Sequence, residues 1–295
     1  MSNLLNVENL SKHYDGFDLR DISFTVPAGS VVGLIGSNGA GKSTTIKSIL
    51  GLVRPDGGSV QLFGEEVLGM PDARFAQLRQ RVGVVFDTCS LPAAATIKEV
   101  RAFMANCYQS WSDRRFDQLL EQFKLPADKA VKELSRGMGM KLSLTCALAA
   151  QPDLLILDEA TAGLDPVARE EALDLLREFM TDEGHGILMS SHITSDLDKL
   201  ADYILCIDEG RIMFALEADA ITDQAGIAQC RQRDLEAVAA SRLFAPGTLH
   251  FERRPMSTAL LVPDRFAFSQ AFPNVVVERA DIDSYMYLVL KGEQL

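Results

Sequence analysis

The chain carries one glycine-rich segment whose residue types and spacing are suited to holding phosphate groups. Residues 36–44 read GSNGAGKST and match the pattern G-x-x-x-x-G-K-[ST], in which successive backbone N–H groups surround phosphate oxygens. In such a loop Lys42 is expected to contact the β- and γ-phosphates, and the Ser43 hydroxyl is expected to bind Mg²⁺. The predicted phosphate-binding residues are Gly36, Ser37, Asn38, Gly39, Ala40, Gly41, Lys42, Ser43 and Thr44. The segment predicts a site for a nucleoside triphosphate.

The context of this loop agrees with a phosphate site. Such a loop requires a strand before it and a helix after it, because the N-terminus of the helix faces the phosphates. The apolar run 30–35 predicts a buried strand, and the helical spacing of apolar residues in 44–50 predicts a helix. A glycine-rich surface turn is the alternative explanation, but the lysine and serine placed after a strand favour the phosphate site.

Two consecutive acids form a second group with chemical potential. Asp158 and Glu159 follow the four apolar residues 154–157, which predict a buried strand. Carboxylates at the end of such a strand lie at the carboxyl edge of a parallel sheet, beside the phosphate loop. We expect Asp158 to hold the Mg²⁺ shell, directly or through water, and Glu159 to polarise an attacking water. Because many strands end in Asp, the acids indicate catalysis only together with the loop.

Strands and helices alternate along the part of the chain that must position these residues. Between residues 96 and 150 the pattern is helical, and 96–99 form a capping box. A helix is also predicted over 167–180. Strands are predicted at 4–10, 22–26, 30–35, 59–63, 82–86, 154–157, 186–190 and 204–207. The fold class is therefore predicted as α/β, with a P-loop NTPase core and a helical subdomain inserted at about 88–150.

The pattern loosens beyond residue 215. Short strands are expected at 249–251, 259–262 and 275–277, and a helix at 282–290. We expect an ATP-binding domain over 1–215 and a small α+β accessory domain over 216–295.

Composition narrows the possible classes of function. The chain has 295 residues, of which 47% are hydrophobic, which is ample for a buried core. A net charge of −12 argues against a nucleic-acid-binding surface, so no nucleic-acid partner is expected. The five cysteines show no C-x-x-C pairing, which is typical of reduced thiols in the cytoplasm. Because no signal peptide and no apolar stretch of about 18 residues is evident, any membrane role must come through a partner.

Further motifs make the chain resemble the ATP-binding subunits of ABC transporters. Residues 134–138, LSRGM, stand where this family has its LSGGQ signature, and 162–165, AGLD, resemble its D-loop. His192 follows two serines and resembles the switch histidine, and Tyr14 precedes the phosphate loop at the distance of the aromatic residue that stacks on adenine. The resemblance covers about 3–215 and implies ATP and Mg²⁺ as cofactors. The signature and the chain end are similar to bacterial subunits encoded beside GntR-type regulators.

The resemblance also implies a dimer in which each nucleotide is shared by two subunits. In the family, the signature loop of one subunit closes over the nucleotide of the other. Ser135 and Gly137 are thus expected to bind the γ-phosphate across the interface, with Asp165 of the D-loop also part of the nucleotide site. His192 is expected to contact the γ-phosphate and hold the attacking water, so that Lys42, Glu159 and His192 are the expected catalytic residues. Outside this order of motifs, a histidine after a strand is usually structural. Phe17 is an alternative to Tyr14 as the residue that stacks on adenine.

Three positions depart from the family pattern. Asp87 stands where the family usually has a glutamine that reaches Mg²⁺; it is shorter by one methylene, and it is either a metal ligand that reaches the ion through a water or a strand-end residue without metal contact. Arg136 and Met138 replace a glycine and the glutamine of the signature. These changes bear on coupling and rate more than on nucleotide binding.

Three functions are compatible with these observations. The favoured one is an ATP-hydrolysing transport subunit at the inner face of the membrane, in a homodimer that drives separately encoded permease subunits. The other two are a soluble ABC ATPase without a transport role and a regulatory subunit with slow turnover. The single phosphate loop and the absence of sustained heptads disfavour the soluble ATPase without a transport role, whereas Asp87 keeps the slow regulatory subunit open.

Overall fold

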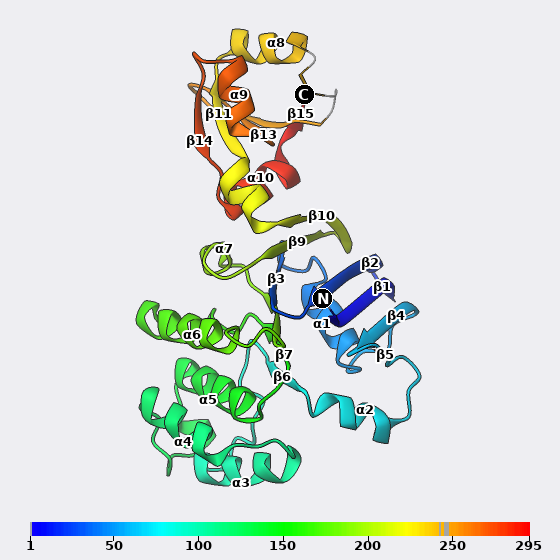
Figure 1. Ribbon diagram of the computed structural model, residues 1–295, viewed down its shortest axis with the longest axis vertical. Helices are drawn as coiled ribbons and strands as arrows, with labels where there is room; N and C mark the ends of the chain where they lie inside the picture. The colour runs from blue at the N-terminus through cyan, green and yellow to red at the C-terminus, as the bar shows by residue number, and fades with distance from the viewer. Residues whose placement is uncertain (1, 242, 245–247) are drawn as a thin grey trace.

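The computed structural model describes residues 2–241, 243–244 and 248–295. Figure 1 shows an elongated molecule in which a mixed α/β core lies between a group of helices at one end and a smaller lobe at the other. No helix within these ranges is both long and apolar enough to cross a bilayer.

A six-stranded sheet, ordered β10-β9-β3-β8-β7-β6, forms the centre of the core. Five neighbouring strands are parallel, and β10 pairs with β9 in the antiparallel direction. Their bounds are β3 (Ser30–Ile35), β6 (Val82–Val85), β7 (Leu154–Asp158), β8 (Gly186–Ser190), β9 (Tyr203–Asp208) and β10 (Arg211–Glu217). Strand β10, which was not predicted, runs through residue 215, where we expected a domain boundary.

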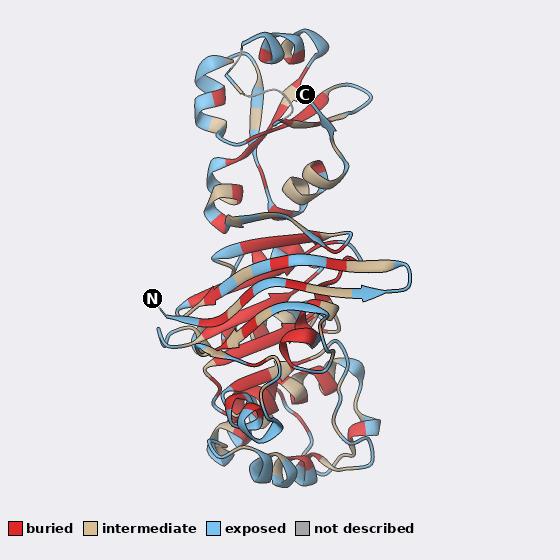
Figure 2. Cartoon of the chain, turned by 90° about the vertical axis from the view of Figure 1, so that its right-hand side faces the viewer, coloured by how far each residue is buried: buried red, intermediate tan, exposed pale blue. Residues whose placement is uncertain are grey.

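Both faces of this sheet are covered, which explains why its strands are continuous apolar runs. Leu155 and Leu157 of β7 pack into one hydrophobic cluster together with helical residues such as Phe116, Leu142 and Leu173. Leu154 and Ile156 point to the opposite face and into a second cluster. Figure 2 shows the result as a band of buried strands through the middle of the molecule.

The second cluster joins the central sheet to an antiparallel sheet ordered β2-β1-β4-β5. Its strands are β1 (Asn3–Tyr14), β2 (Phe17–Pro27), β4 (Gly57–Leu62) and β5 (Glu65–Glu66). Helix α1 (Lys42–Ile49) contributes Ile46 and Ile49 to the same cluster, so the helix after the phosphate loop is fixed by packing. Helix α2 (Asp72–Arg79), which was not predicted, leads into β6.

The predicted helical subdomain consists of α3 (Ile97–Cys107), α4 (Asp113–Gln122), a 3₁₀ turn (Val131–Glu133) and α5 (Arg136–Ala149). The capping box is present: Glu99 N–H donates to Thr96 Oγ1 at 3.3 Å, and Thr96 N–H donates to Glu99 Oε2 at 2.7 Å. Phe116 and Leu119 of α4 are fully buried against α5. This packing holds the start of α5, where the signature residues lie.

Helices α6 (Pro166–Phe179) and α7 (Thr194–Leu197) complete the core. The remaining residues form a lobe around a sheet ordered β14-β11-β13-β12-β15. A short π-helix, Ala220–Gln224, precedes it. The lobe's elements are β11 (Gly226–Cys230), α8 (Gln232–Ser241), β12 (His250–Arg253), β13 (Thr258–Val262), α9 (Arg265–Ala271), β14 (Val276–Arg279), α10 (Ile282–Lys291) and β15 (Glu293–Gln294).

Within this lobe, β12, β13, β14 and α10 match the predicted segments, whereas β11, α8 and α9 were missed. Helix α10 anchors the lobe to the core. Ile282 is fully buried in the same cluster as Leu197 of α7, and its N–H donates to Asp198 Oδ1 at 3.3 Å.

Candidate functional site

The phosphate loop connects β3 to α1, as the sequence predicts, and its glycines are required by close backbone contacts. Gly36 has a φ of 147°, and a Cβ there would lie 1.9 Å from the Ile207 carbonyl oxygen. Gly41 caps α1 with a φ of 117°, and its Cβ would come within 2.7 Å of Leu19. Any larger residue at either position would push the loop away from β9 or β2.

Lys42 is buried at the base of this loop and holds its shape. The Nζ atom donates to the carbonyl oxygens of Gly36 at 2.8 Å and Ser37 at 3.1 Å. The outer side of the loop borders a hollow lined by Phe17, residues 38–44 and Glu159. The arrangement therefore places backbone N–H groups, a helix N-terminus and an amine around one concave space, which suits a polyphosphate.

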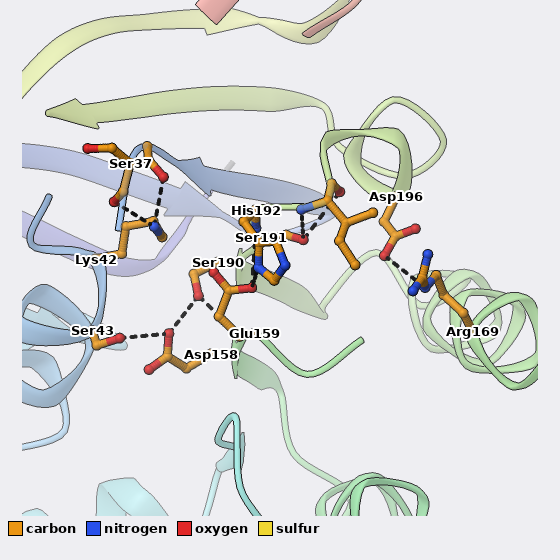
Figure 3. A network of polar contacts seen from close by, with 12 residues as sticks. Ser37, Lys42, Ser43, Asp158, Glu159, Arg169, Ser190, Ser191, His192 and Asp196 are labelled. Atoms are coloured by element: carbon orange, nitrogen blue, oxygen red, sulfur yellow. Dashed lines mark hydrogen bonds and ion pairs between the residues drawn. The ribbon is translucent and has the colours of Figure 1, made fainter. Parts of the chain in front are cut away.

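The carboxyl ends of β7 and β8 bring the first acid to the loop (Figure 3). Asp158 is buried, and its Oδ1 accepts hydrogen bonds from Ser43 Oγ at 3.2 Å and from Ser190 Oγ at 2.6 Å. Asp158 and Ser190 are paired residues of the parallel register, which explains their contact. Sequence reasoning gave Ser190 no role of its own, although its place at the end of a buried strand next to the acidic strand was a signal.

Glu159 and His192 form the second contact of the site. The Glu159 N–H donates to both the carbonyl oxygen and the hydroxyl of Ser190 at 3.1 Å, which holds Glu159 at a left-handed φ of 55°. Its Oε2 lies 2.5 Å from His192 Nδ1 and accepts the His192 N–H at 3.2 Å. The acid and the histidine that we expected to be catalytic are therefore in direct contact at the edge of the hollow.

The signature and D-loop residues lie at helix N-termini. Ser135 caps α5 by accepting the Met138 N–H at 3.2 Å, and Asp165 caps α6 by accepting the N–H groups of Val167 and Ala168. The bond from Ala168 is the main cause of a pKa of the Asp165 carboxyl below its usual value. Ser135 and Gly137 are not among the residues lining the hollow at the phosphate loop.

The two aromatic candidates lie at the turn between β1 and β2. Tyr14 and Phe17 face each other across this hairpin. Tyr14 is 39% exposed, and its ring centroid lies 5.5 Å from the Lys12 amine, whereas Phe17 lines the hollow beside the phosphate loop. Of the two, Phe17 lies beside the hollow and Tyr14 is not among the residues that line it, so which of them stacks on a base stays a prediction.

The residues expected at a metal site are only partly brought together. Ser43 and Asp158 are hydrogen-bonded, but Asp87 is an exposed residue in the bend after β6. Among the described residues, no group of three or more His, Cys, Asp or Glu side chains is arranged to hold a metal. One hydroxyl and one carboxylate still fit Mg²⁺, which usually takes one or two protein carboxylates together with phosphate oxygens and water.

Comparison with known proteins decides the family. Residues 19–162 match the ABC transporter family. The chain is 34% identical over 274 residues to the daunorubicin/doxorubicin resistance ATP-binding protein of Streptomyces peucetius. The matched region covers 89% of this chain and 80% of that protein. The chain belongs to the ABC transporter family. It is also 39% identical over 213 residues to Nod factor export ATP-binding protein I of Burkholderia lata, covering 70% of this chain and 68% of that protein.

Solved structures of ABC proteins agree. One described as the ATP-binding subunit of an ABC transporter has a TM-score of 0.67 and 32% identity, covering 74% of this chain and 91% of that one. A dimeric ATP-binding cassette in a post-hydrolysis state with ADP and Pi has a TM-score of 0.66 at 21% identity, covers 72% of this chain and 98% of that one, and shows the fold alone. This ABC protein is thus an ATP-binding, ATP-hydrolysing transporter subunit with the predicted α/β fold.

Proposed function

We propose that this ABC subunit is the motor of a transporter, in which ATP closes two copies of the chain and hydrolysis releases them. The observation that carries this proposal is the continuous set of contacts from Ser43 through Asp158 and Ser190 to Glu159 and His192. It joins the phosphate loop to an acid and a histidine suited to positioning water.

Each residue of the site has a distinct role in this proposal. Lys42 and the loop N–H groups bind the phosphates, and Ser43 and Asp158 hold Mg²⁺, which when bound offsets phosphate charge. Glu159 accepts a hydrogen bond from the attacking water and polarises it. His192 orients Glu159 through the 2.5 Å contact, and in this proposal it also contacts the γ-phosphate. Tyr14 stacks on the adenine, and Asp87 supplements the metal shell through water.

A second copy of the chain completes each site. Ser135 and Gly137 do not line the hollow beside their own phosphate loop, so they are free to face the nucleotide of the partner. The N-terminus of the fourteen-residue helix α5 then faces the γ-phosphate, where its partial positive charge is stabilising. Asp165 lies beside this interface, because the D-loop is in contact with the signature: a Cβ on Gly137 would lie 3.3 Å from the Gly163 carbonyl oxygen.

The membrane partner is proposed to bind beside β6, on the cytoplasmic side of the membrane. Segment 88–96 follows Asp87 and leads into α3. A small hollow there is lined by residues of β6, this segment, α3 and α5, including Phe86, Leu91 and Met104. An amphipathic helix of a separately encoded permease fits an apolar groove of this kind.

The first test is ATP-dependent dimerisation of a variant that binds ATP without cleaving it. Glu159→Gln removes the charge that polarises water and leaves the phosphate loop intact. We expect this variant to double its mass in light scattering with ATP and Mg²⁺, and the ATPase rate per molecule of the native chain to rise with protein concentration.

Glu183→Gln is the matched control, because Glu183 is an exposed loop acid outside the site. It is expected to keep native turnover and to remain monomeric after hydrolysis. An inactive native chain together with a monomeric Glu159→Gln variant would contradict the homodimeric motor. A dimer with very slow turnover would instead support a regulatory subunit.

A further inference from the structure

An ion pair between a half-buried arginine and a buried aspartate lies beside the loop that carries His192, outside the contacts that the proposed function uses (Figure 3). Arg169 of α6 places its Nε 4.0 Å from Oδ2 of Asp196 on α7. The Asp196 side chain is 3% exposed. Both atoms are buried, and within the described part of the chain neither has a hydrogen-bond partner. The Asp196 carboxylate therefore depends on Arg169 for its electrostatic stabilisation, whereas the Arg169 side chain, 27% exposed, also reaches solvent.

Arg169 also holds the D-loop. Its Nη2 donates to the Leu164 carbonyl oxygen at 3.3 Å, one residue before the α6 cap Asp165. The Arg169 N–H itself donates to the Asp165 carbonyl oxygen at 2.9 Å, so the side chain projects from the first turn of a stable helix. A guanidinium is suited to this position because its several N–H groups can serve two acceptors at once.

Helix α7 needs such an anchor because it is only four residues long. A helix of this length has too few internal hydrogen bonds to be stable by itself. It starts two residues after His192, and the intervening turn is held by the Ile193 N–H bond to Ser191 Oγ at 2.9 Å. The direction of the His192 side chain therefore depends on how α7 is fixed by its neighbours.

We propose that Arg169 and Asp196 are a positioning pair for ATP hydrolysis. The pair holds the D-loop and the His192 loop in a fixed relation, so that His192 meets Glu159 on one side while the D-loop meets the partner subunit on the other. This inference rests on the proposed function. Since ion pairs contribute little net stability whether exposed or buried, we attribute to this pair the role of fixing the two loops relative to each other.

The test separates positioning from stability by removing the charges one at a time and then together. Arg169→Gln leaves Asp196 buried without a partner and is expected to lower the melting temperature. The double variant Arg169→Gln/Asp196→Asn removes both charges and is expected to recover most of that melting temperature. Turnover is expected to stay roughly ten- to a hundredfold below native in the double variant, with an unchanged KM for ATP, because the phosphate loop is untouched.

A matched control lies on the same helix. Arg177 and Asp174 form an exposed ion pair at 2.5 Å, and Arg177→Gln/Asp174→Asn is expected to keep native turnover. If turnover in the Arg169→Gln/Asp196→Asn variant returns to near native along with its melting temperature, the pair is only structural and the proposal is wrong.

A second readout does not depend on turnover. The chain has four histidines, so the imidazole signals of labelled protein are resolvable by NMR. We expect the ring signal of His192 to shift in the Arg169→Gln/Asp196→Asn variant, while those of His13, His185 and His250 stay in place. An unmoved His192 signal would overturn the proposal even if the motor function is correct. Absent ATPase activity in the native chain would contradict the motor alone.

Discussion

At the scale of single residues, Ser190 links the two acids of the site. Its hydroxyl donates to Asp158 and accepts the N–H of Glu159, and the residue is fully buried at the end of β8. A hydroxyl is suited to this position because it donates and accepts at the same time. Asp158 and Glu159, the acids that we propose bind the metal and polarise water, are therefore held in one geometry by the register of two neighbouring strands.

Two matched variants test which aromatic residue stacks on adenine. If Tyr14 stacks, Tyr14→Ala is expected to weaken ATP binding roughly ten- to a hundredfold, since stacking contributes about 1–3 kcal/mol. Phe17→Ala is expected to change the affinity for ATP by about twofold or less. Isothermal titration with ATP and with inorganic triphosphate checks this, because loss of stacking weakens only the former. A larger loss of ATP affinity in Phe17→Ala than in Tyr14→Ala would assign the stacking role to Phe17, which lines the hollow.

Asp165 gives a prediction on pH. The N–H groups of Ala168 and Val167 lower the pKa of its carboxyl below the usual 3.8. A lowered folded-state pKa stabilises the fold above the ordinary Asp range, and this contribution is lost as pH falls through the folded-state value. Asp165→Asn keeps the cap without the charge. We expect its melting temperature to lie below native at pH 7 and the gap to close below 3.8. A gap that widens on acidification would contradict the assignment.

At the scale of elements, the packing of α4 decides whether the signature residues are held in place. Phe116 is fully buried, with its ring 5.3 Å from that of Trp111. Phe116→Ala is expected to destabilise the helical subdomain by about 3–5 kcal/mol through the cavity it leaves. Because Trp111 is the only tryptophan, urea unfolding followed by its fluorescence reports on this subdomain directly.

Phe103 on α3 is the matched control for Phe116. It is 54% exposed, so Phe103→Ala is expected to change stability by about 0.5 kcal/mol or less. If both variants lose stability equally, burial of Phe116 is not what holds the subdomain together.

Elements with a strong local pattern were predictable from the sequence, and those that depend on tertiary packing were not. The phosphate loop, β7 with the acids Asp158 and Glu159 at its end, and the Thr96 capping box all carry short-range signals. Strand β11 was missed because Gly226, Ala228 and Gln229 have weak strand preference, although the strand lies between β13 and β14. The contact between Arg169 and Asp196 joins residues 27 positions apart with no pattern to connect them.

At the scale of the whole molecule, the C-terminal lobe is attached to α7, the helix that follows His192. Helix α10 packs on α7 through Ile282, and the opposite end of α10 brings Lys291 into a hollow with residues 37–40 of the phosphate loop. The lobe is thus fixed to the core at α7, and the end of α10 approaches the phosphate loop.

The same scale includes the second copy of the chain. Each ATP site takes Lys42 and Glu159 from one copy and, in our account, Ser135 from the other. We expect a subunit with a defective phosphate loop to be inactive alone, and likewise a subunit with a defective signature. When the two are mixed, each mixed dimer contains one intact site.

Mixing Lys42→Ala with Ser135→Glu protein tests this central claim most directly. The glutamate places a negative charge against the partner's γ-phosphate. We predict that the equimolar mixture recovers roughly a quarter of native ATPase activity, because half of the dimers are mixed and each has one working site of two. A mixture that stays as inactive as its components, while native protein assayed in parallel is active, would contradict the shared site.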